Sequence, residues 1–207
     1  MLRNVVLSLA LLGALSAAGL FAFAAPSAAP TPAAVPADTY EIDAGHSTVV
    51  FAVKHLGVGK FYGRFNDMSG SFQYGSGSLD AGSVAITIAS GSVDTNNKGR
   101  DRHLKNSDFF DAKQFPEIKF QGKKISGAGN DSFTLAGDIT MLGVTKPIEF
   151  EVEKVGEGDD PWGNFRTGFV AKGSIKRTDF NMEYGLADGA LGNEVELIVS
   201  LEGVKKK

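Results

Sequence analysis

The sequence contains no cysteine in its 207 residues. This absence excludes disulfide bonds, thiolate metal sites, a cysteine nucleophile and the lipid-modified cysteine of a bacterial lipoprotein. Basic residues do not outnumber acidic ones: the formal net charge is −3, which excludes a strongly basic nucleic-acid binder. The chain is instead rich in Gly and Phe, with 26 and 15 residues, and this composition favours turns and strands over helices.

Common catalytic and nucleotide-binding motifs are missing too. The sequence has no G-x-S-x-G, G-x-G-x-x-G or P-loop. Its three histidines show no metal-ligand spacing, since His46 and His55 are an odd number of residues apart and His103 is distant from both. We therefore expect no catalytic residue, no metal and no resident cofactor. A three-histidine zinc site assembled by tertiary contacts is the alternative.

The start of the chain differs from the rest in composition. Residues 1–24 combine a positive charge, a long apolar run and an A-F-A cleavage signal at 22–24, which is typical of a secretory signal peptide. Residues 25–38 are rich in Ala and Pro and are expected to form a disordered linker. We expect an exported, soluble protein whose folded domain is residues 39–207. An uncleaved anchor helix is the alternative, because the apolar run is nearly long enough to span a bilayer.

From residue 40 onward, apolar and polar residues alternate with a period of two in about eight segments. In one of them Ile148, Phe150 and Val152 alternate with glutamates. A single apolar face on each segment is the pattern of antiparallel strands with one buried side. The sequence therefore predicts an all-β protein, an eight-stranded antiparallel barrel.

Residues 96–114 interrupt the alternation with a polar stretch. Short helical turns are expected at 101–105 and 107–111, so this connection should carry one or two short helices over a barrel end. It also holds a cationic cluster, which either binds an anionic or carbonyl head group at the barrel mouth or pairs with nearby aspartates. The cluster consists of Arg100, Arg102, His103 and Lys105.

Two further interpretations concern the inside of the barrel. Gly137, Ala171 and Gly173 fall on the predicted inner face, and small residues there suggest unfilled volume. Neighbouring Phe side chains could instead fill that space, or the glycines could mark bulges, so a ligand cavity and a packed barrel both stay open. We also expect an Arg177–Asp179 pair at a strand end, with the next residue, a Phe, turned inward.

Six motifs in a fixed order resemble the YceI-like family over about residues 39–204. They are Tyr40–Ser47 with Val49–His55, RDRHL at 100–104, SDFFD at 107–111, FPEIKF at 115–120, LAGDITMLGVTKP at 135–147 and RTDFN at 177–181. The resemblance implies a lipocalin-like barrel, exported to the periplasm, that binds polyisoprenoids or similar long-chain amphiphiles in its lumen. Asn181 stands where the family often has Gly, and because Asn tolerates left-handed backbone the turn is expected to survive.

Alternation and the resemblance together give candidate ligand-binding residues. The candidate lumen residues are Phe51, Val53, Ile86, Ile88, Phe120, Leu135, Gly137, Ile139, Phe169 and Leu197. The candidate mouth and lid residues are His55, Arg102, His103, Phe109 and Phe110. A register error of one residue would turn any of these strands inside out.

The leading hypothesis is a periplasmic carrier for an isoprenoid quinone, a polyprenyl phosphate, a fatty amide or a similar amphiphile. An enzyme that acts on such lipids through His46, His55 or His103 is one alternative. A stress-related interaction protein with a packed barrel is the other. Expected partners are the lipid ligand, a membrane surface in transient contact and a second copy of the chain, but not nucleic acid.

Overall fold

The computed structural model describes residues 37–75, 78–127, 129 and 131–207. The expected signal peptide at 1–24 and nearly all of the expected linker at 25–38 lie outside the described residues. The first strand begins at Asp38, one residue before the expected start of the domain. Within the described part of the chain, no helix is both long and apolar enough to cross a bilayer.

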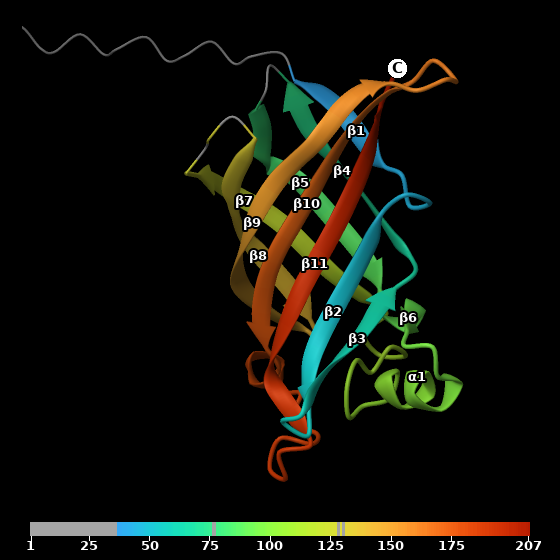
Figure 1. The fold of residues 1–207 in the computed structure, drawn as a ribbon, viewed down its shortest axis with the longest axis vertical. Helices are drawn as coiled ribbons and strands as arrows, with labels where there is room; N and C mark the ends of the chain where they lie inside the picture. Colours follow the sequence, from blue (N-terminus) through green and yellow to red (C-terminus); the bar gives the residue numbers. More distant parts are fainter. Residues whose placement is uncertain (1–36, 76–77, 128, 130) are drawn as a thin grey trace, which may run out of the picture. The chain divides into compact units, whose positions relative to one another are not determined.

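The described chain is built almost entirely of strands, with one short α-helix and two 3-10 turns (Figure 1). The strands are β1 (Asp38–Ile42), β2 (Thr48–His55), β3 (Gly59–Phe65), β4 (Met68–Gly75), β5 (Ser78–Ala89), β6 (Val93–Asp94), β7 (Glu117–Ser126), β8 (Ser132–Met141), β9 (Val144–Asp159), β10 (Phe165–Lys176) and β11 (Leu191–Lys205). The helices are α1 (Lys98–Leu104), η1 (Ser90–Ser92) and η2 (Arg177–Phe180).

Six of these segments form three interrupted strands. The first is β1 with β2, which pair with successive parts of β11. The second is β3 with β4, in which β4 pairs with β1 and β3 pairs with β2. The third is β5 with β6, in which β5 pairs with β4 and β6 pairs with β3. Together with β7 to β11 they make eight strands, each antiparallel to the next, and the pairing of β11 with β1 and β2 closes the ring. The predicted eight-stranded antiparallel barrel is confirmed.

Phe rings cover the glycines of the inner face. A Cβ atom added at any of four glycines would lie less than 3.0 Å from a Phe ring of another strand, which is closer than real Cβ atoms approach. The pairs are Phe51 over Gly63, Phe120 over Gly137, Phe150 over Gly173 and Phe72 over Gly203. Neighbouring Phe side chains therefore fill the space over Gly137 and Gly173, as the second interpretation held.

The connection from β6 to β7 carries α1, which lies beside β6 and β3 at one end of the barrel (Figure 1). The Asn97 side chain caps the helix by accepting a hydrogen bond from the Arg100 backbone N–H at 3.0 Å. The helical turn expected at 107–111 is not a helix but a series of turns, in which the Phe110 N–H donates to the Leu104 carbonyl.

Candidate functional site

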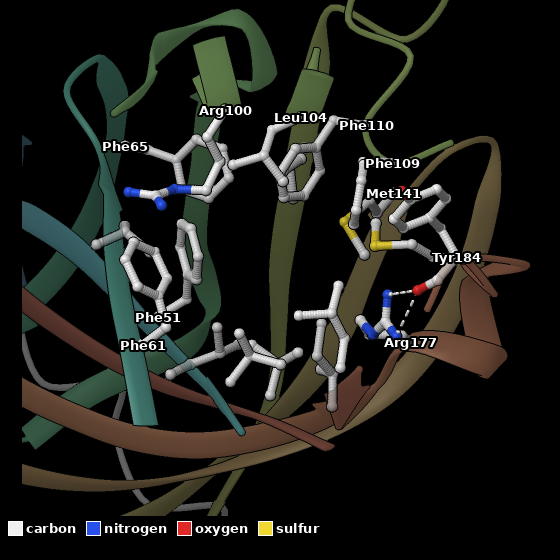
Figure 2. Close-up of a pocket in the computed structure, with 18 of the residues that line it drawn as sticks. Phe51, Phe61, Phe65, Arg100, Leu104, Phe109, Phe110, Met141, Arg177 and Tyr184 are labelled. Atoms are coloured by element: carbon white, nitrogen blue, oxygen red, sulfur yellow. Dashed lines mark hydrogen bonds between the residues drawn. The ribbon is translucent and has the colours of Figure 1, made fainter. Parts of the chain in front are cut away.

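A cavity of about 380 Å³ lies inside the barrel at the end that α1 covers (Figure 2). Barrel strands form most of its wall, and α1, the turn after it and the loop between η2 and β11 form the rest. The wall is apolar apart from a few side chains near the mouth. Its volume falls in the range of small-molecule binding sites. The apolar wall includes Val49, Phe51, Val53, Phe61, Phe65, Ile118, Ile139, Val195 and Leu197.

A second cavity of about 80 Å³ continues the first toward the far end of the barrel. On β10 the first cavity contacts Ile175, whereas the second contacts Ala171 and Phe169, which lie farther from α1. Five residues line both cavities: Val49, Ile88, Ile118, Ile139 and Leu197. The lumen is therefore an apolar column that is wide near the mouth and narrow beyond it.

Nine of the ten candidate lumen residues line one or both cavities. They are Phe51, Val53, Ile86, Ile88, Phe120, Leu135, Ile139, Phe169 and Leu197. Gly137 is the exception, because the ring of Phe120 lies over it and separates it from the open space. Its small size makes room for a neighbouring ring, not for a ligand.

Four of the five candidate mouth residues, His55, His103, Phe109 and Phe110, line the first cavity. Arg102 is exposed and does not line it, which corrects its predicted place; Arg100 does. The reason is helical spacing: Arg100, His103 and Leu104 are three and four residues apart and share the face of α1 that meets the barrel, and Arg102 does not.

Aromatic contacts hold the turn after α1 over the mouth. Phe110 meets Phe65 of β3 edge-on, with ring centroids 5.2 Å apart. Phe109 is buried and contacts Tyr184 at 5.2 Å and His103 at 5.1 Å. Sequence reasoning missed Tyr184, which lies in a polar loop with no alternation to mark it. We call residues 105–112 the lid.

His103 is the titratable group of the mouth with a carboxylate partner. Its Nε2 lies 2.9 Å from Oδ2 of Asp108, and its ring meets that of Tyr184 edge-on at 4.8 Å. Asp108 itself does not line the cavity. The pair orients the imidazole and places it at the rim, beside the aromatic residues of the lid.

Arg177 is buried in the cavity wall, with only 4% of its surface exposed. Its Nε donates to the Gly192 carbonyl at 2.9 Å, and Nη1 and Nη2 donate to the Tyr184 carbonyl at 2.9 and 3.0 Å (Figure 2). Burial lowers the pKa of this guanidinium. The expected Arg177–Asp179 pair is wrong, since the guanidinium donates to these carbonyls and makes no ion pair with the exposed Asp179.

The turn after η2 explains that difference. Asn181 has a left-handed backbone (φ 59°), as predicted, and it turns the chain so that two later carbonyls reach the guanidinium. Phe180 points inward, also as predicted, and is 1% exposed. The Arg177 side chain therefore fastens the loop between η2 and β11 to the barrel.

An ion-pair network lies toward the other end of the barrel, on its outer face, since Arg166 alternates with the buried Thr167 of β10. Arg166 of β10 donates to Asp43 at 2.7 Å, to Asp160 at 2.7 Å and to Glu202 at 2.5 Å. Its guanidinium, followed by His46, lowers the pKa of Asp43 to about 2. Asp160 is six residues from Arg166, but Asp43 and Glu202 are far from it in sequence, so no local pattern predicts the whole network.

The same network contains a group that could ligate a metal. One ligand atom from each of Asp43, His46 and Glu202 lies within 4.8 Å of the others. This set contains one histidine, not the three of the zinc site considered from the sequence. Arg166 already donates to both carboxylates, and His46 Nδ1 lies 2.9 Å from Asp43. His55 and His103 line the cavity instead, so the three histidines do not converge.

Comparisons with known proteins agree with this architecture. A family model described as the YceI-like domain matches residues 40–203. Protein YceI of Escherichia coli O157:H7 is 43% identical over 176 residues, which are 84% of this chain and 90% of the relative.

Two solved structures share the fold. A crystal structure of the Campylobacter jejuni YceI protein is 31% identical, with a TM-score of 0.67 over 74% of this chain and 90% of that one. A domain from Saccharophagus degradans, described as a polyisoprenoid-binding domain, has a TM-score of 0.60 at 16% identity, over 81% of this chain and 98% of that one. At that identity the likeness concerns the fold alone.

Proposed function

The chain belongs to the YceI-like family, and on that premise we propose that it is a periplasmic carrier that holds a polyisoprenoid or a similar long-chain amphiphile in its barrel. The observation that carries the proposal is the apolar column formed by the two cavities, with its arginine and histidine side chains all on the wall of the larger cavity at the mouth. A slender apolar chain fits such a column, with its polar group at the mouth. The export step rests on the signal peptide that the sequence predicts at residues 1–24.

The energetics favour chains over compact ligands. Burying an apolar chain stabilises the complex by about 0.8 kcal/mol per methylene, before the costs of association and of ordering the chain. This free energy has no direction, so the depth of the column selects chain length. The identity of the head group must be recognised by polar side chains at the mouth, such as His55 and His103.

Extraction of the protein purified from its own periplasm, followed by mass spectrometry with no lipid added, tests the proposal. A long-chain amphiphile in stoichiometric amount is the expected result. A folded protein that yields an empty extract, and that also fails to take up added polyprenol, would contradict the carrier function and favour an interaction protein.

Delivery of a lipid requires contact with a membrane, and the mouth has an apolar edge for it. Leu56 and Val58, at the β2–β3 turn, are 59% and 87% exposed. The Leu56 N–H donates to the Ala190 carbonyl at 2.9 Å, and Ala190 lines the cavity. We propose that this turn contacts the bilayer transiently during transfer. A homodimer stays a prediction from the sequence.

The His103–Asp108 pair keeps an enzyme as the second candidate. The two groups are within hydrogen-bond distance at the rim of a lipid-sized cavity, as general acid–base chemistry requires. Incubating the protein with polyprenol or polyprenyl phosphate and analysing the lipid by mass spectrometry decides between the two. A product that His103→Gln abolishes would establish the enzyme; unchanged lipid supports the carrier.

A further inference from the structure

The charge of the larger cavity differs in sign from that of the chain. Two guanidinium groups and two imidazoles line the cavity, and no carboxylate does so among the residues that the structure describes. Yet acidic residues outnumber basic ones in the whole sequence, 24 to 21. The larger cavity is therefore a basic site in a protein whose net charge is negative.

Of the two guanidinium groups, that of Arg177 belongs to a buried residue and that of Arg100 to an exposed one. A guanidinium has five N–H donors, and three of them reach carbonyl oxygens. Within the described chain, no carboxylate forms an ion pair with this side chain, although it is 4% exposed. A buried charge without a counter-charge costs free energy, and an anion in the cavity would offset that cost.

Arg100, on the opposite wall in Figure 2, makes two hydrogen bonds and a contact with an aromatic ring. Its guanidinium lies over the Phe61 ring, 4.1 Å from the centroid, and donates to the side chain and the carbonyl of Thr95. The residue is also exposed, so water solvates its charge. Arg100 can add to the positive potential of the mouth, but it does not need an anion.

The position of Arg177 fits the polar end of an amphiphile. It follows β10 directly at the mouth, two residues after Ile175, which also lines the cavity. A head group placed there would leave the apolar chain free to run past Ile139 and Leu197 into the narrower cavity.

We propose that Arg177 anchors an acidic head group, a phosphate or a carboxylate, of the amphiphile bound in the barrel. The inference rests on the proposed carrier function and narrows its ligand class. Charge-assisted hydrogen bonds from a guanidinium to such a group are about twice as strong as neutral ones. A polyprenyl phosphate would therefore bind more tightly than a polyprenol of the same chain length, because the chain contributes equally to both.

Binding of these two probes to the delipidated protein tests the proposal. The wild type should bind the phosphate at least about tenfold more tightly than the alcohol. Arg177→Met should abolish that preference, because any loosening of the loop that Arg177 fastens weakens the binding of both probes alike, and Arg177→Lys should keep part of it. Arg102→Met, which removes a cation outside the cavity, is the matched control and should keep the full preference.

The outcomes distinguish a failure of the acidic head group from a failure of the carrier function. Equal affinity of the wild type for both probes would overturn the acidic head group and leave the carrier function standing. Failure to bind either probe would overturn the carrier function itself. An equal loss for both probes in a folded Arg177→Met protein would make Arg177 a structural residue only. If that variant does not fold, the wild-type ratio and Arg177→Lys decide.

Inorganic phosphate supplies the remaining control. Inorganic phosphate at millimolar concentration, added to the complex with polyprenyl phosphate, should not displace the lipid, because it makes no contact with the apolar column. Displacement would assign Arg177 to a free anion and overturn a lipid head group.

Discussion

The ring of Phe120 on β7 lies over Gly137 on β8, so that a Cβ at residue 137 would be 2.6 Å from the ring. The backbone carbonyl of Gln121 is equally in the way and cannot rotate aside. We expect Gly137→Ala to lower the free energy of unfolding by about 1–3 kcal/mol, the usual cost of overpacking. Urea denaturation of the variant and the wild type measures this difference in the free energy of unfolding.

Gly158→Ala is the matched control on the next strand, β9. A Cβ there meets nothing within 4 Å. Its free energy of unfolding should stay close to that of the wild type. If both variants behaved alike, the close packing of Phe120 over Gly137 would not matter to stability.

A second prediction concerns the point where the two cavities meet. Leu197 lines both, and Leu197→Trp should fill the column there. Affinity for a polyisoprenoid should fall by about tenfold or more, and overpacking should cost about 1–3 kcal/mol of stability. Ligand titration and thermal unfolding on the same sample separate the two effects.

The control for that variant is the adjacent position. Ile198 is 38% exposed on the outer surface of β11, and Ile198→Trp should leave binding unchanged. Normal uptake by a folded Leu197→Trp protein would mean that the ligand does not lie in the lumen.

The network around Arg166 predicts a dependence of stability on pH. The pKa of Asp43 is about 2 in the folded protein, below its ordinary value of 3.8, so its stabilising effect is present above about pH 4. The effect is lost as the pH falls through 2. Arg166→Gln should therefore unfold at a lower temperature than the wild type at pH 7, and the gap should narrow between pH 4 and pH 2.

Arg64→Gln controls for the loss of a positive charge. Arg64 makes a longer contact with Asp94, 3.4 Å, on the exposed surface, and such pairs stabilise little. Its melting temperature should stay near that of the wild type at every pH. A gap for Arg166→Gln that did not narrow in acid would show that Asp43 is not the group responsible.

The apolar turn at the mouth gives a fourth prediction. Replacing Leu56 and Val58 by Ser should slow transfer of a polyisoprenoid to lipid vesicles, with equilibrium binding of the lipid in solution unchanged. Ser at Val155 and Trp162, which are 69% and 75% exposed on β9 and in the β9–β10 turn, is the matched control. Equal slowing by both double variants would contradict a specific role for the mouth.

Local pattern predicted the strands well because side chains alternate in every strand. Ile148, Phe150 and Val152 are buried and the glutamates between them are exposed, as their alternation indicates. The interruptions of β1–β2, β3–β4 and β5–β6 were not predicted, since they depend on how the barrel bends to close.

Site residues could be predicted only where alternation within a single strand fixes which way a side chain points. Nine lumen residues follow from strand periodicity, but the place of Gly137 depends on a ring from the neighbouring strand. Arg177 has an acidic residue two positions away, so sequence alone favours a local pair. The left-handed turn at Asn181 brings two carbonyls to it instead. Arg166 binds Asp160, which is six residues away, but also Asp43 and Glu202 from distant segments, which no local pattern indicates.

Both long connections of the barrel, residues 95–116 between β6 and β7 and residues 177–190 between β10 and β11, lie at the same end because neighbouring strands alternate in direction. The remaining connections are shorter in sequence, with at most five residues between one strand and the next. These two connections supply Arg100, His103 and Arg177 to the wall of the larger cavity, whereas strand residues line most of the apolar column. Exchanging the two loops between relatives is therefore expected to change the head group that is recognised, while the barrel strands keep the length of chain that the column accepts.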